Sequence, residues 1–526
     1  MHSVPSRLSL RSGWALVVAL GLATACGSDD DLAGPEGSGP NTSSGGSSGP
    51  GSQPGTEPGS GADGGTQPGT DGGTTEPDRF NNYLRPYAAD SPWNSRPVGA
   101  VLGTATIPDS VMAWRPVISD GKGFSTGVFL AVESDPPMVV KGNGAGSTIY
   151  DKDVEEKYPS ITIPHWPADV FPATEGDGHA DIVDETLKIV HSFNGLRKAA
   201  DGTWAARDYG WSRLDGRGWG DPAHYFQGAR ATGVPASAGI VRKHEFLGTD
   251  AVYRHALSLS LPHNAIKKGE GDAPTAYVYP ATQGDGNDPS LANSGQIPEG
   301  ALLMLPADFD SSTMPTPELV RIAETLKTYG AYVTDRNHAT PFNIYVEIGT
   351  GYSLGPAGAA VDGALATLQH ALRPLESAAS WVDGYDRPTL RHPKLELQTM
   401  RGKWSLPNSG TVIDGSYATW QQAVVLPEAG ISRFSGWNND RVSWGKNVAG
   451  TSYRVEVETT GGATVQYKVY CDAPNAGTKA DSGVLSNGQG FDLVWPTGTG
   501  RCTPQITVVG GAAGATARAR LHAAGE

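Results

Sequence analysis

Short apolar or alternating runs, each ended by glycine, proline, asparagine or aspartate, fill the chain between residues 79 and 300. Strands that alternate with turn residues produce this pattern. We therefore predict a mainly β main domain over residues 79–390, built as a β-sandwich or a jelly-roll-like fold. The clearest runs are residues 126–132, 138–140, 187–193, 256–261 and 276–279.

One helix, and then a second, interrupts the strand pattern of the main domain. Thr316 suits an N-cap, Pro317 suits the first turn, and Gly330 suits the end of the first helix. A second helix is predicted over residues 360–372, before Pro374. The apolar face of the first helix consists of Leu319, Ile322, Ala323 and Leu326.

The first 78 residues predict an export signal and a tether. The apolar run over residues 14–22 is far shorter than the roughly 20 residues that span a bilayer, so residues 1–25 are a signal peptide. The Ala-Thr-Ala-Cys junction resembles a bacterial lipobox, with alanine where leucine is usual, and predicts a lipid on Cys26. Residues 26–78 are almost entirely Gly, Ser, Thr, Pro, Asp and Glu, which predicts a disordered linker. The expected location is the cell envelope, periplasmic or outer surface, with soluble secretion as the alternative.

Valine-rich alternating strands separated by glycine turns begin near residue 395. They predict a smaller C-terminal β-sandwich over residues 395–526, joined through a hinge at residues 387–394. Cys471 and Cys502 are an even pair in an exported chain, so we expect a disulfide between them. Such a sandwich often holds a carbohydrate, but a domain that only packs against its neighbour fits the sequence about as well.

The chain is acidic, with a formal net charge of −15 at pH 7. This charge argues against nucleic acid as a partner. The linker carries no lysine or arginine, so we expect contact with the membrane through the lipid anchor only. Lysine and arginine exceed aspartate and glutamate between residues 190 and 245, which indicates an anionic polymer as the ligand.

The chain contains no triad signature, zincin helix or other specific catalytic motif, so the candidates come from strand faces. Side chains alternate along a strand. Asn343, Tyr345 and Glu347 should therefore share the face opposite the core residues Ile344 and Val346. The alternative is that Glu347 is a solvated carboxylate and that the tyrosine only covers a sheet.

A second polar face carries His179 and Asp181, and Glu245, His255 and Tyr279 complete the catalytic candidates. These are the groups that proton transfer at a sugar requires. We expect the polar faces to lie together as one open cleft. In the alternative interpretation the histidines are structural and fully hydrogen-bonded.

The stretch from residue 204 to residue 230 interleaves aromatic residues with arginines and glycines. Aromatic rings stack on the C–H face of a pyranose, and guanidinium groups bind carboxylates or sulfates. We expect a glycan-binding loop here, whereas the alternative places the tryptophans in the core. The substrate-binding candidates are Trp204, Arg207, Trp211, Arg213, Trp219, Tyr225 and Arg230, together with Asn343 and Tyr345.

No cofactor and no metal ligand is predicted, although two acidic clusters suit calcium. One cluster spans residues 285–288, and the other combines Glu175 and Asp177 with Asp181 and Asp184. Neither has the helix-loop-helix calcium spacing, and short Asp/Gly/Asn strings are usually plain turns.

The middle of the chain resembles an uncharacterised family of secreted bacterial proteins. The resemblance covers about 180 residues and implies that they form one domain, but it implies no activity. It rests on His179 to Trp204, residues 228–233, His244-Glu245, His255-Ala256-Leu257, Tyr279-Pro280-Ala281 and Tyr329-Gly330.

These observations favour a surface-anchored enzyme that degrades an extracellular polysaccharide. A hydrolase would pair Glu347 with Asp181 or Glu245. A β-eliminating lyase would neutralise a uronate with Arg207, Arg213 or Arg230 and move protons with His179, His255 or Tyr279. The rival hypothesis is a non-catalytic lipoprotein that binds glycan or mediates adhesion.

Overall fold

The computed structural model describes most of the chain after residue 78. The gaps are residues 121–122, 153–155, 175, 219–227, 247, 270–274, 286–290, 355–357, 391–395, 400–403, 406–411, 414–423, 437–446, 473–475, 498–500 and 525–526. Cys26 and the predicted signal peptide and linker lie outside the described residues. The structure is 39% strand and 9% helical, so the mainly β prediction is confirmed.

The largest sheet has nine strands, and its centre is mixed because β13 pairs with β15, and β16 with β2, in parallel. In spatial order the strands are β1 (Arg96–Leu102), β18 (Arg373–Val382), β14 (Leu302–Met304), β15 (Ala331–Asn337), β13 (Leu257–Pro262), β16 (Asn343–Tyr345), β2 (Val117–Ser119) and β17 (Ser353–Leu354), and β19 (Pro388–Thr389) pairs with β18.

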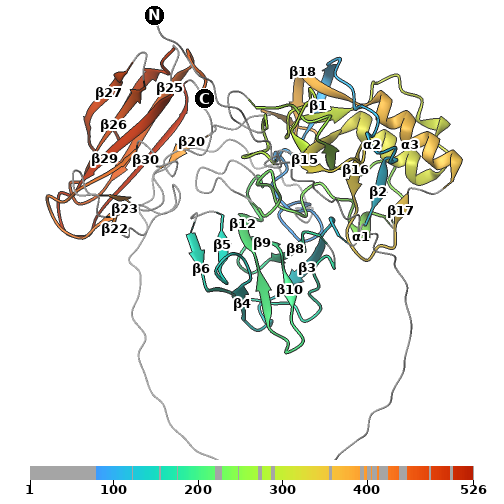
Figure 1. Ribbon diagram of the computed structural model, residues 1–526, viewed down its shortest axis with the longest axis horizontal. Coiled ribbons are helices and arrows are strands. Elements are labelled where there is room, and N and C mark those ends of the chain that lie inside the picture. The colour runs from blue at the N-terminus through green and yellow to red at the C-terminus, as the bar shows by residue number, and fades with distance from the viewer. Residues whose placement is uncertain are drawn as a thin grey trace, which may run out of the picture. The chain divides into compact units, whose positions relative to one another are not determined.

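Two helices cover one face of this sheet (Figure 1). α2 spans Pro317–Thr328, and its N-cap Thr316 accepts a hydrogen bond from the Leu319 backbone N–H, as predicted. α3 spans Ala359–Ala371, which confirms the second predicted helix. Leu326 of α2 and Leu365 of α3 belong to one buried cluster with strand residues of the sheet. The remaining short elements are α1 (Lys243–Phe246) and a 3-10 turn at Ser311–Thr313.

Two smaller sheets pack against each other on the other side of the nine-stranded sheet. The six-stranded sheet runs β3 (Gly127–Ala131), β8 (Ala180–Asp184), β9 (Ile189–Asn194), β12 (Asp208–Arg213), β5 (Ile149–Asp151) and β6 (Glu156–Tyr158). The four-stranded sheet runs β10 (Arg197–Lys198), β11 (Trp204–Ala206), β4 (Met138–Gly142) and β7 (Ser160–Ile163).

The side chains of β8 show how these layers are stacked. Val183 packs with Tyr332 and Tyr345 of the nine-stranded sheet, whereas Ile182 packs with Trp204 of the four-stranded sheet. All five residues of β8 are buried for this reason. The six-stranded sheet is therefore an inner layer, apolar on both faces.

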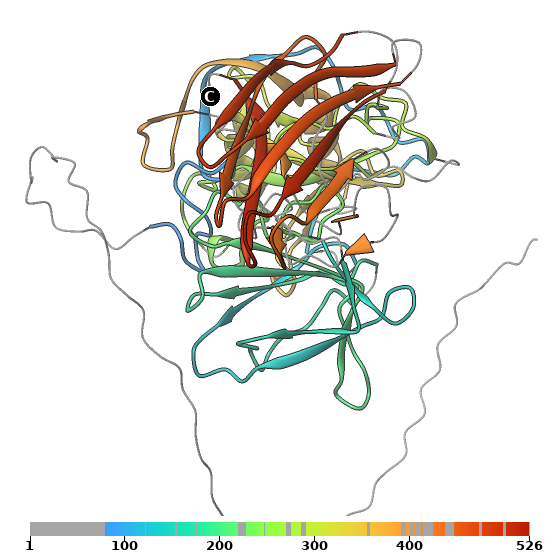
Figure 2. The ribbon, with the colours of Figure 1, turned by 90° about the vertical axis from the view of Figure 1, so that its left-hand side faces the viewer.

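The C-terminal strands form two antiparallel sheets around a separate core, as the alternating pattern predicts (Figures 1 and 2). One sheet contains β20 (Glu396–Thr399), β30 (Ala515–Ala523), β25 (Ser452–Thr459) and β28 (Gly490–Val494), with β23 (Val424–Leu426) on β30. The other contains β22 (Val412–Ile413), β21 (Trp404–Ser405), β24 (Ser432–Gly436), β29 (Cys502–Val509), β26 (Thr464–Cys471) and β27 (Gly477–Leu485).

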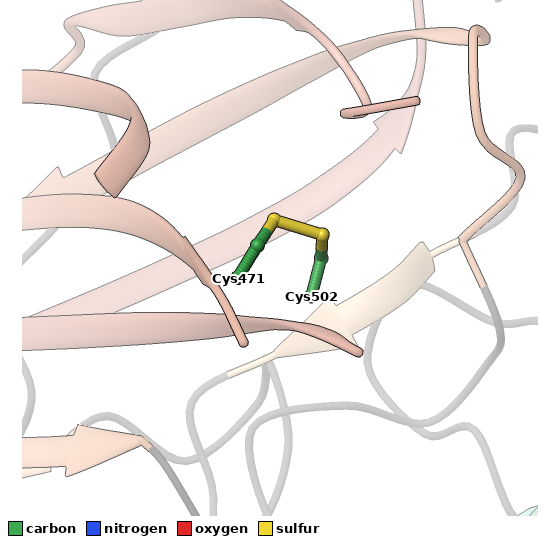
Figure 3. Close-up of a disulfide and its surroundings, with 2 residues drawn as sticks. All are labelled: Cys471 and Cys502. Carbon is green, nitrogen blue, oxygen red and sulfur yellow. A yellow bond between two sulfur atoms is a disulfide. The ribbon is translucent and has the colours of Figure 1, made fainter. Parts of the chain in front are cut away.

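A disulfide joins Cys471 at the end of β26 to Cys502 at the start of β29 (Figure 3). The two residues are directly opposite each other in the antiparallel register. The predicted pairing is confirmed. None of the helices in the described residues is long and apolar enough to cross a membrane.

Candidate functional site

A cavity of about 660 Å³ lies between the nine-stranded and the six-stranded sheets. One wall comes from β2, β13, β15 and β16, and the other comes from the ends of β9 and β12 and from the loop before β8. This size suits a small ligand or a few sugar units. The polar and charged residues of the lining are Ser119, Lys152, Asp177, His179, Asn194, Arg207, Asp208, Ser260, Asp285, Asp335, Arg336, Asn337, His338, Thr340, Asn343 and Tyr345.

A glycine-rich loop brings Asp177 and His179 to the start of β8. Gly176 and Gly178, on either side of Asp177, have φ angles of +56° and +58°, which residues with a Cβ rarely adopt. A Cβ on Gly178 would lie 1.8 Å from Arg197 Nη1. The sequence Gly-Asp-Gly-His therefore permits a tight approach that places both functional groups at the cavity.

His179 is buried, with 1% of its surface exposed. Its Nδ1 lies 3.0 Å from the carbonyl oxygen of Phe193, which can only accept, so Nδ1 carries the proton. Burial and the positive charge of Arg230 hold the pKa of His179 well below its usual value. The ring is therefore neutral. Its Nε2 carries no proton, can coordinate a metal ion through its lone pair, and lies 3.8 Å from Asp177 Oδ2.

Asp335 lies at the end of β15 and is held from several sides. Arg230 Nη1 donates to Asp335 Oδ2 at 3.0 Å, and the Tyr345 hydroxyl lies 3.4 Å from the same oxygen. The backbone N–H of Arg336 donates to Oδ1 at 2.9 Å. Arg230 is fully buried, and its guanidinium lies 3.9 Å from the centre of the Tyr345 ring. These contacts fix the Asp335 carboxylate in one orientation.

Asp177, His179 and Asp335 meet in space. One donor atom from each side chain lies within 4.8 Å of the other two. Burial and the nearby Asp335 carboxylate raise the pKa of Asp177 to about 6, so a cation near this carboxylate would be stabilising. Two carboxylate oxygens and one imidazole nitrogen are a donor set that can hold a metal ion.

Two basic side chains, Lys152 and Arg207, flank this centre beside the six-stranded sheet. Lys152 Nζ donates to the backbone carbonyl of Arg230 at 3.0 Å, and burial lowers the pKa of Lys152. Arg207 Nε donates to Asp208 at 3.1 Å, and its Nη2 donates to Asn194 Oδ1. Arg207 retains 56% side-chain exposure. An anionic ligand in the cavity would thus meet positive charge.

Trp114 and Phe124 also line the cavity, although 47% and 56% of their surfaces are exposed. Trp114 lies against His338, with ring centroids 6.0 Å apart. Exposed aromatic rings beside a polar cavity provide flat apolar surfaces onto which sugar rings can stack.

Four of the predicted site residues line this cavity: His179, Arg207, Asn343 and Tyr345. Asp181 and Arg230 lie behind its wall. Asp181 Oδ2 accepts a hydrogen bond from the Ser237 backbone N–H at 2.7 Å, and burial raises the pKa of this carboxyl. Neither is placed to bind a substrate directly, so their predicted roles are corrected to support of the cavity.

The prediction that Glu347 shares the cleft of His179 is wrong. Ile344 and Val346 do enter one core cluster while Tyr345 enters another, so the alternation along the strand is confirmed. Glu347, however, does not line the cavity. Its carboxylate is 1% exposed and accepts from Arg242 Nε at 2.8 Å and from the backbone N–H of Lys243 at 3.0 Å.

Glu245 and His255 also lie away from the cavity and pair with each other. His255 Nε2 is 3.0 Å from Glu245 Oε2. The hydrolase pairs proposed from the sequence, Glu347 with Asp181 or Glu245, do not form, because each of these carboxylates is occupied by its own partners.

The stretch after residue 204 begins with the strands β11 and β12 rather than with a loop, which corrects the predicted glycan-binding loop. Trp204 is 3% exposed and packs on Trp166, with centroids 5.1 Å apart, inside the core between the two smaller sheets. Trp211 packs against the same core, and Arg213 pairs with Asp215 on the surface. Tyr279 is buried outside the cavity lining. Trp219 and Tyr225 lie outside the described residues.

The acidic cluster proposed for calcium does not assemble around Asp181 and Asp184. Asp184 Oδ2 lies 2.7 Å from His165 Nδ1, and its Oδ1 accepts from the Leu187 backbone N–H. Glu175 and residues 286–290 lie outside the described residues, and Asp285 lines the cavity.

Sequence reasoning missed Asp335, Lys152, Trp114 and Phe124. Asp335 had a usable signal, because a polar Asp-Arg-Asn run directly follows the apolar strand that begins at Ala331. The two aromatic residues lie in irregular segments, where no periodicity distinguishes a surface aromatic from a core one.

No family model and no curated protein sequence matches the chain. Partial likenesses among solved structures include the Glycosylation Associate Protein (Gap123) complex from Streptococcus agalactiae, at 11% identity over 24% of this chain and 45% of that one, with a TM-score of 0.15. The N-terminal cellulose-binding domain from Cellulomonas fimi β-1,4-glucanase C matches at 14% identity over 23% of this chain and 84% of that domain, with a TM-score of 0.14.

A family GH115 4-O-methyl-α-glucuronidase with specificity for decorated arabinogalactans matches at 12% identity, over 30% of this chain and 20% of that enzyme, with a TM-score of 0.14. This chain thus spans less than half of the Streptococcus agalactiae chain, the first of the three. At TM-scores this low, the likenesses assign neither a fold nor a function to the chain.

Proposed function

We propose that the protein is an enzyme that cleaves an anionic polysaccharide by β-elimination in the cavity between the two sheets. The observation that carries this proposal is the combination of groups in one cavity of about 660 Å³. Exposed rings of Trp114 and Phe124 suit sugar stacking, and the Arg207 cation lies in the same lining as Asp177, His179 and Asp335.

β-Elimination at a uronate needs three functions. A cation neutralises the carboxylate, a base removes the proton from the adjacent carbon, and the glycosidic oxygen leaves with the electron pair of its C–O bond and acquires a proton. The electrons of the broken C–H bond become the new carbon–carbon double bond. Arg207 can bind the carboxylate through its guanidinium fork. Lys152, whose pKa is lowered by burial, is the best candidate for the base.

Hydrolysis is the second candidate reaction, because Asp177 and Asp335 both face the cavity. A glycoside hydrolase needs two carboxyl groups that are free to exchange protons or attack. Asp335 instead accepts hydrogen bonds from Arg230 and the Arg336 backbone, and the Tyr345 hydroxyl lies beside it. A carboxylate so engaged is a poor nucleophile, which favours elimination.

The experiment is a panel of anionic and neutral polysaccharides in which reducing ends and unsaturated-uronate absorbance are followed separately. Elimination raises both signals. New reducing ends without the absorbance would show hydrolysis and refute elimination. Binding of a polysaccharide without either product would favour the glycan-binding hypothesis over both reactions. Lys152→Ala should lower the rate by about a hundredfold or more, whereas Lys141→Ala, at an exposed lysine of β4, should leave it unchanged.

We also propose that the enzyme is anchored in the cell envelope by a lipid on Cys26. The support is the Ala-Thr-Ala-Cys junction followed directly by a long polar linker. Cys26→Ala should block processing or release the protein from membranes. Mass spectrometry that finds an unmodified Cys26 at the mature amino terminus would refute the anchor.

A further inference from the structure

The side chains of Asp177, His179 and Asp335 converge on one point at the cavity wall. Their donor atoms lie within 4.8 Å of one another, and His179 Nε2 is 3.8 Å from Asp177 Oδ2. Two ligands that each bind a metal at about 2.1 Å are separated by roughly 3 to 4 Å. A contraction of about 1 Å would therefore bring all three donors into coordination.

His179 gives independent support for a ligand at this point. Only 2% of the side-chain surface is exposed, and the Nδ1–H donates to the Phe193 carbonyl oxygen. Its Nε2 makes no hydrogen bond within the part of the chain that the structure describes. An Nδ1–H bound to a backbone carbonyl is the outer contact that orients metal-binding histidines, and it leaves the Nε2 lone pair available for a ligand in the cavity that His179 lines.

Asp335 has the outer contacts expected of a metal-binding carboxylate. Arg230 and the Arg336 backbone N–H hold it in place, and the Tyr345 hydroxyl lies beside the same oxygen that Arg230 contacts. Oδ2 accepts from both Arg230 and Tyr345, whereas Oδ1 accepts from the Arg336 backbone N–H and has a second lone pair available for an ion. Asp177 is only half-buried and forms no hydrogen bond of its side chain among the described residues, so it is free to move onto an ion.

We propose that Asp177, His179 and Asp335 bind one divalent cation of the Zn²⁺ or Mn²⁺ class. One imidazole and two carboxylates suit these ions better than Ca²⁺ or Mg²⁺, which prefer oxygen ligands alone. Three protein ligands leave coordination positions open toward the cavity, as in catalytic rather than structural sites.

The charges around the proposed ion indicate which substrate group would bind there, and this inference rests on the proposed function. Two carboxylates oppose one dication and the buried Arg230, which leaves an excess of one positive charge. A uronate carboxylate on the ion would neutralise this excess. It would also make the adjacent C–H more acidic, because the metal withdraws electron density from the carboxylate.

The test is cation binding by the full chain after chelator treatment and dialysis. ZnCl₂, MnCl₂, CaCl₂ and MgCl₂ are titrated separately by calorimetry, and the Mn²⁺ complex is also followed by its electron paramagnetic resonance. One Zn²⁺ or Mn²⁺ should bind per chain, at least about tenfold more tightly than Ca²⁺ or Mg²⁺. Asp177→Asn and His179→Ala should weaken binding by about a hundredfold or more.

Asp208→Asn is the matched control, since Asp208 lines the same cavity but pairs with Arg207. Its affinity should equal that of the wild type. If His179→Ala does not fold, as judged by circular dichroism, the half-buried Asp177→Asn still decides the matter. The proposal is overturned if no cation binds stoichiometrically, or if Asp177→Asn binds as the wild type does.

The outcome separates the metal from the proposed function. Cleavage that persists undiminished after complete chelation would refute a catalytic metal ion but would support the proposed enzyme activity. Stoichiometric binding of Zn²⁺ or Mn²⁺, without product from any polysaccharide, would support the metal site and would refute the polysaccharide lyase hypothesis.

Discussion

Two clusters in the main domain contain the same kinds of side chain but differ in how fully these are paired. Each has one histidine, two carboxylates and a buried arginine stacked on a tyrosine. The open cluster consists of His179, Asp177, Asp335, Arg230 and Tyr345, and the closed cluster consists of His255, Glu245, Glu347, Arg242 and Tyr83.

In the closed cluster each charge meets its partner directly. Arg242 binds Glu347 at 2.8 Å, and His255 lies 3.0 Å from Glu245. His255 lines a cavity of about 30 Å³, and Glu245 also borders a pocket of about 510 Å³ that His255 does not line. These two ion pairs hold the groups of the closed cluster in place, although Arg242 Nη2 and Glu347 Oε1 are buried without a hydrogen-bond partner among the described residues.

In the open cluster only Asp335 and Arg230 are paired, and His179 and Asp177 stand 3.8 Å apart beside a cavity of about 660 Å³. The comparison teaches that residue type does not identify a reactive centre. What distinguishes the open cluster is that His179 Nε2 and the Asp177 carboxylate form no hydrogen bond among the described residues, and that both groups line one cavity with Asp335.

The largest expected effect on stability belongs to the closed cluster. Glu347→Gln should lower the free energy of unfolding by about 3 to 5 kcal/mol, because it leaves the charge of Arg242 buried without its partner. Urea unfolding measures this. Asp208→Asn, which removes one partner of a more exposed pair, should cost less than about 1 kcal/mol. Equal effects of the two substitutions would contradict the distinction between the clusters.

The next effect is a pH dependence that Glu245 of the closed cluster supplies. Burial alone would raise the pKa of Glu245, but His255 and the Arg242 backbone N–H outweigh it and hold the pKa at about 2. A carboxyl with a lowered pKa stabilises the fold above its unfolded pKa, near 4.5, and loses this contribution as the pH falls toward 2.

Between pH 5.5 and pH 3 this carboxylate should account for a loss of about 2 kcal/mol. Glu245→Gln should remove that part of the pH dependence, as measured by urea midpoints at each pH. Parallel curves for wild type and variant would show that the pair is weaker than its geometry indicates.

The smallest expected effect concerns the mouth of the open cluster's cavity. Trp114→Ala should raise KM about fivefold, by removing roughly 1 kcal/mol of sugar stacking, and should leave kcat nearly unchanged. Stability should change by less than about 0.5 kcal/mol, because the ring is half exposed. Val139→Ala, at an exposed apolar residue of β4, is the control. An unchanged KM would show that Trp114 does not contact the substrate.

Much of the fold could be predicted because its signals are local. β26 alternates between half-buried and buried residues along its whole length, as the sequence pattern requires. Thr316 and Gly330 bracket α2 for reasons that lie within a few residues of each end. The disulfide could be predicted because Cys471 and Cys502 are an even pair of cysteines in a chain that we expect to be exported.

The site could be predicted only in part, because it depends on how the layers are stacked. Alternation correctly placed Tyr345 opposite Ile344, but it could not show that the polar face ends in a cavity near Tyr345 and in a closed ion pair at Glu347. Asp335 reaches His179 only because two sheets pack face to face. Trp204 is covered by a further sheet for the same reason.

The most direct test of the central claim compares the two histidines in turnover of the polysaccharide that the panel identifies. His179→Ala should lower kcat by about a hundredfold or more, whereas His255→Ala should lower it by less than about threefold. Both variants should remain folded by circular dichroism. Equal losses, a larger loss for His255→Ala, or no cleavage of any polysaccharide by the wild type would contradict the account.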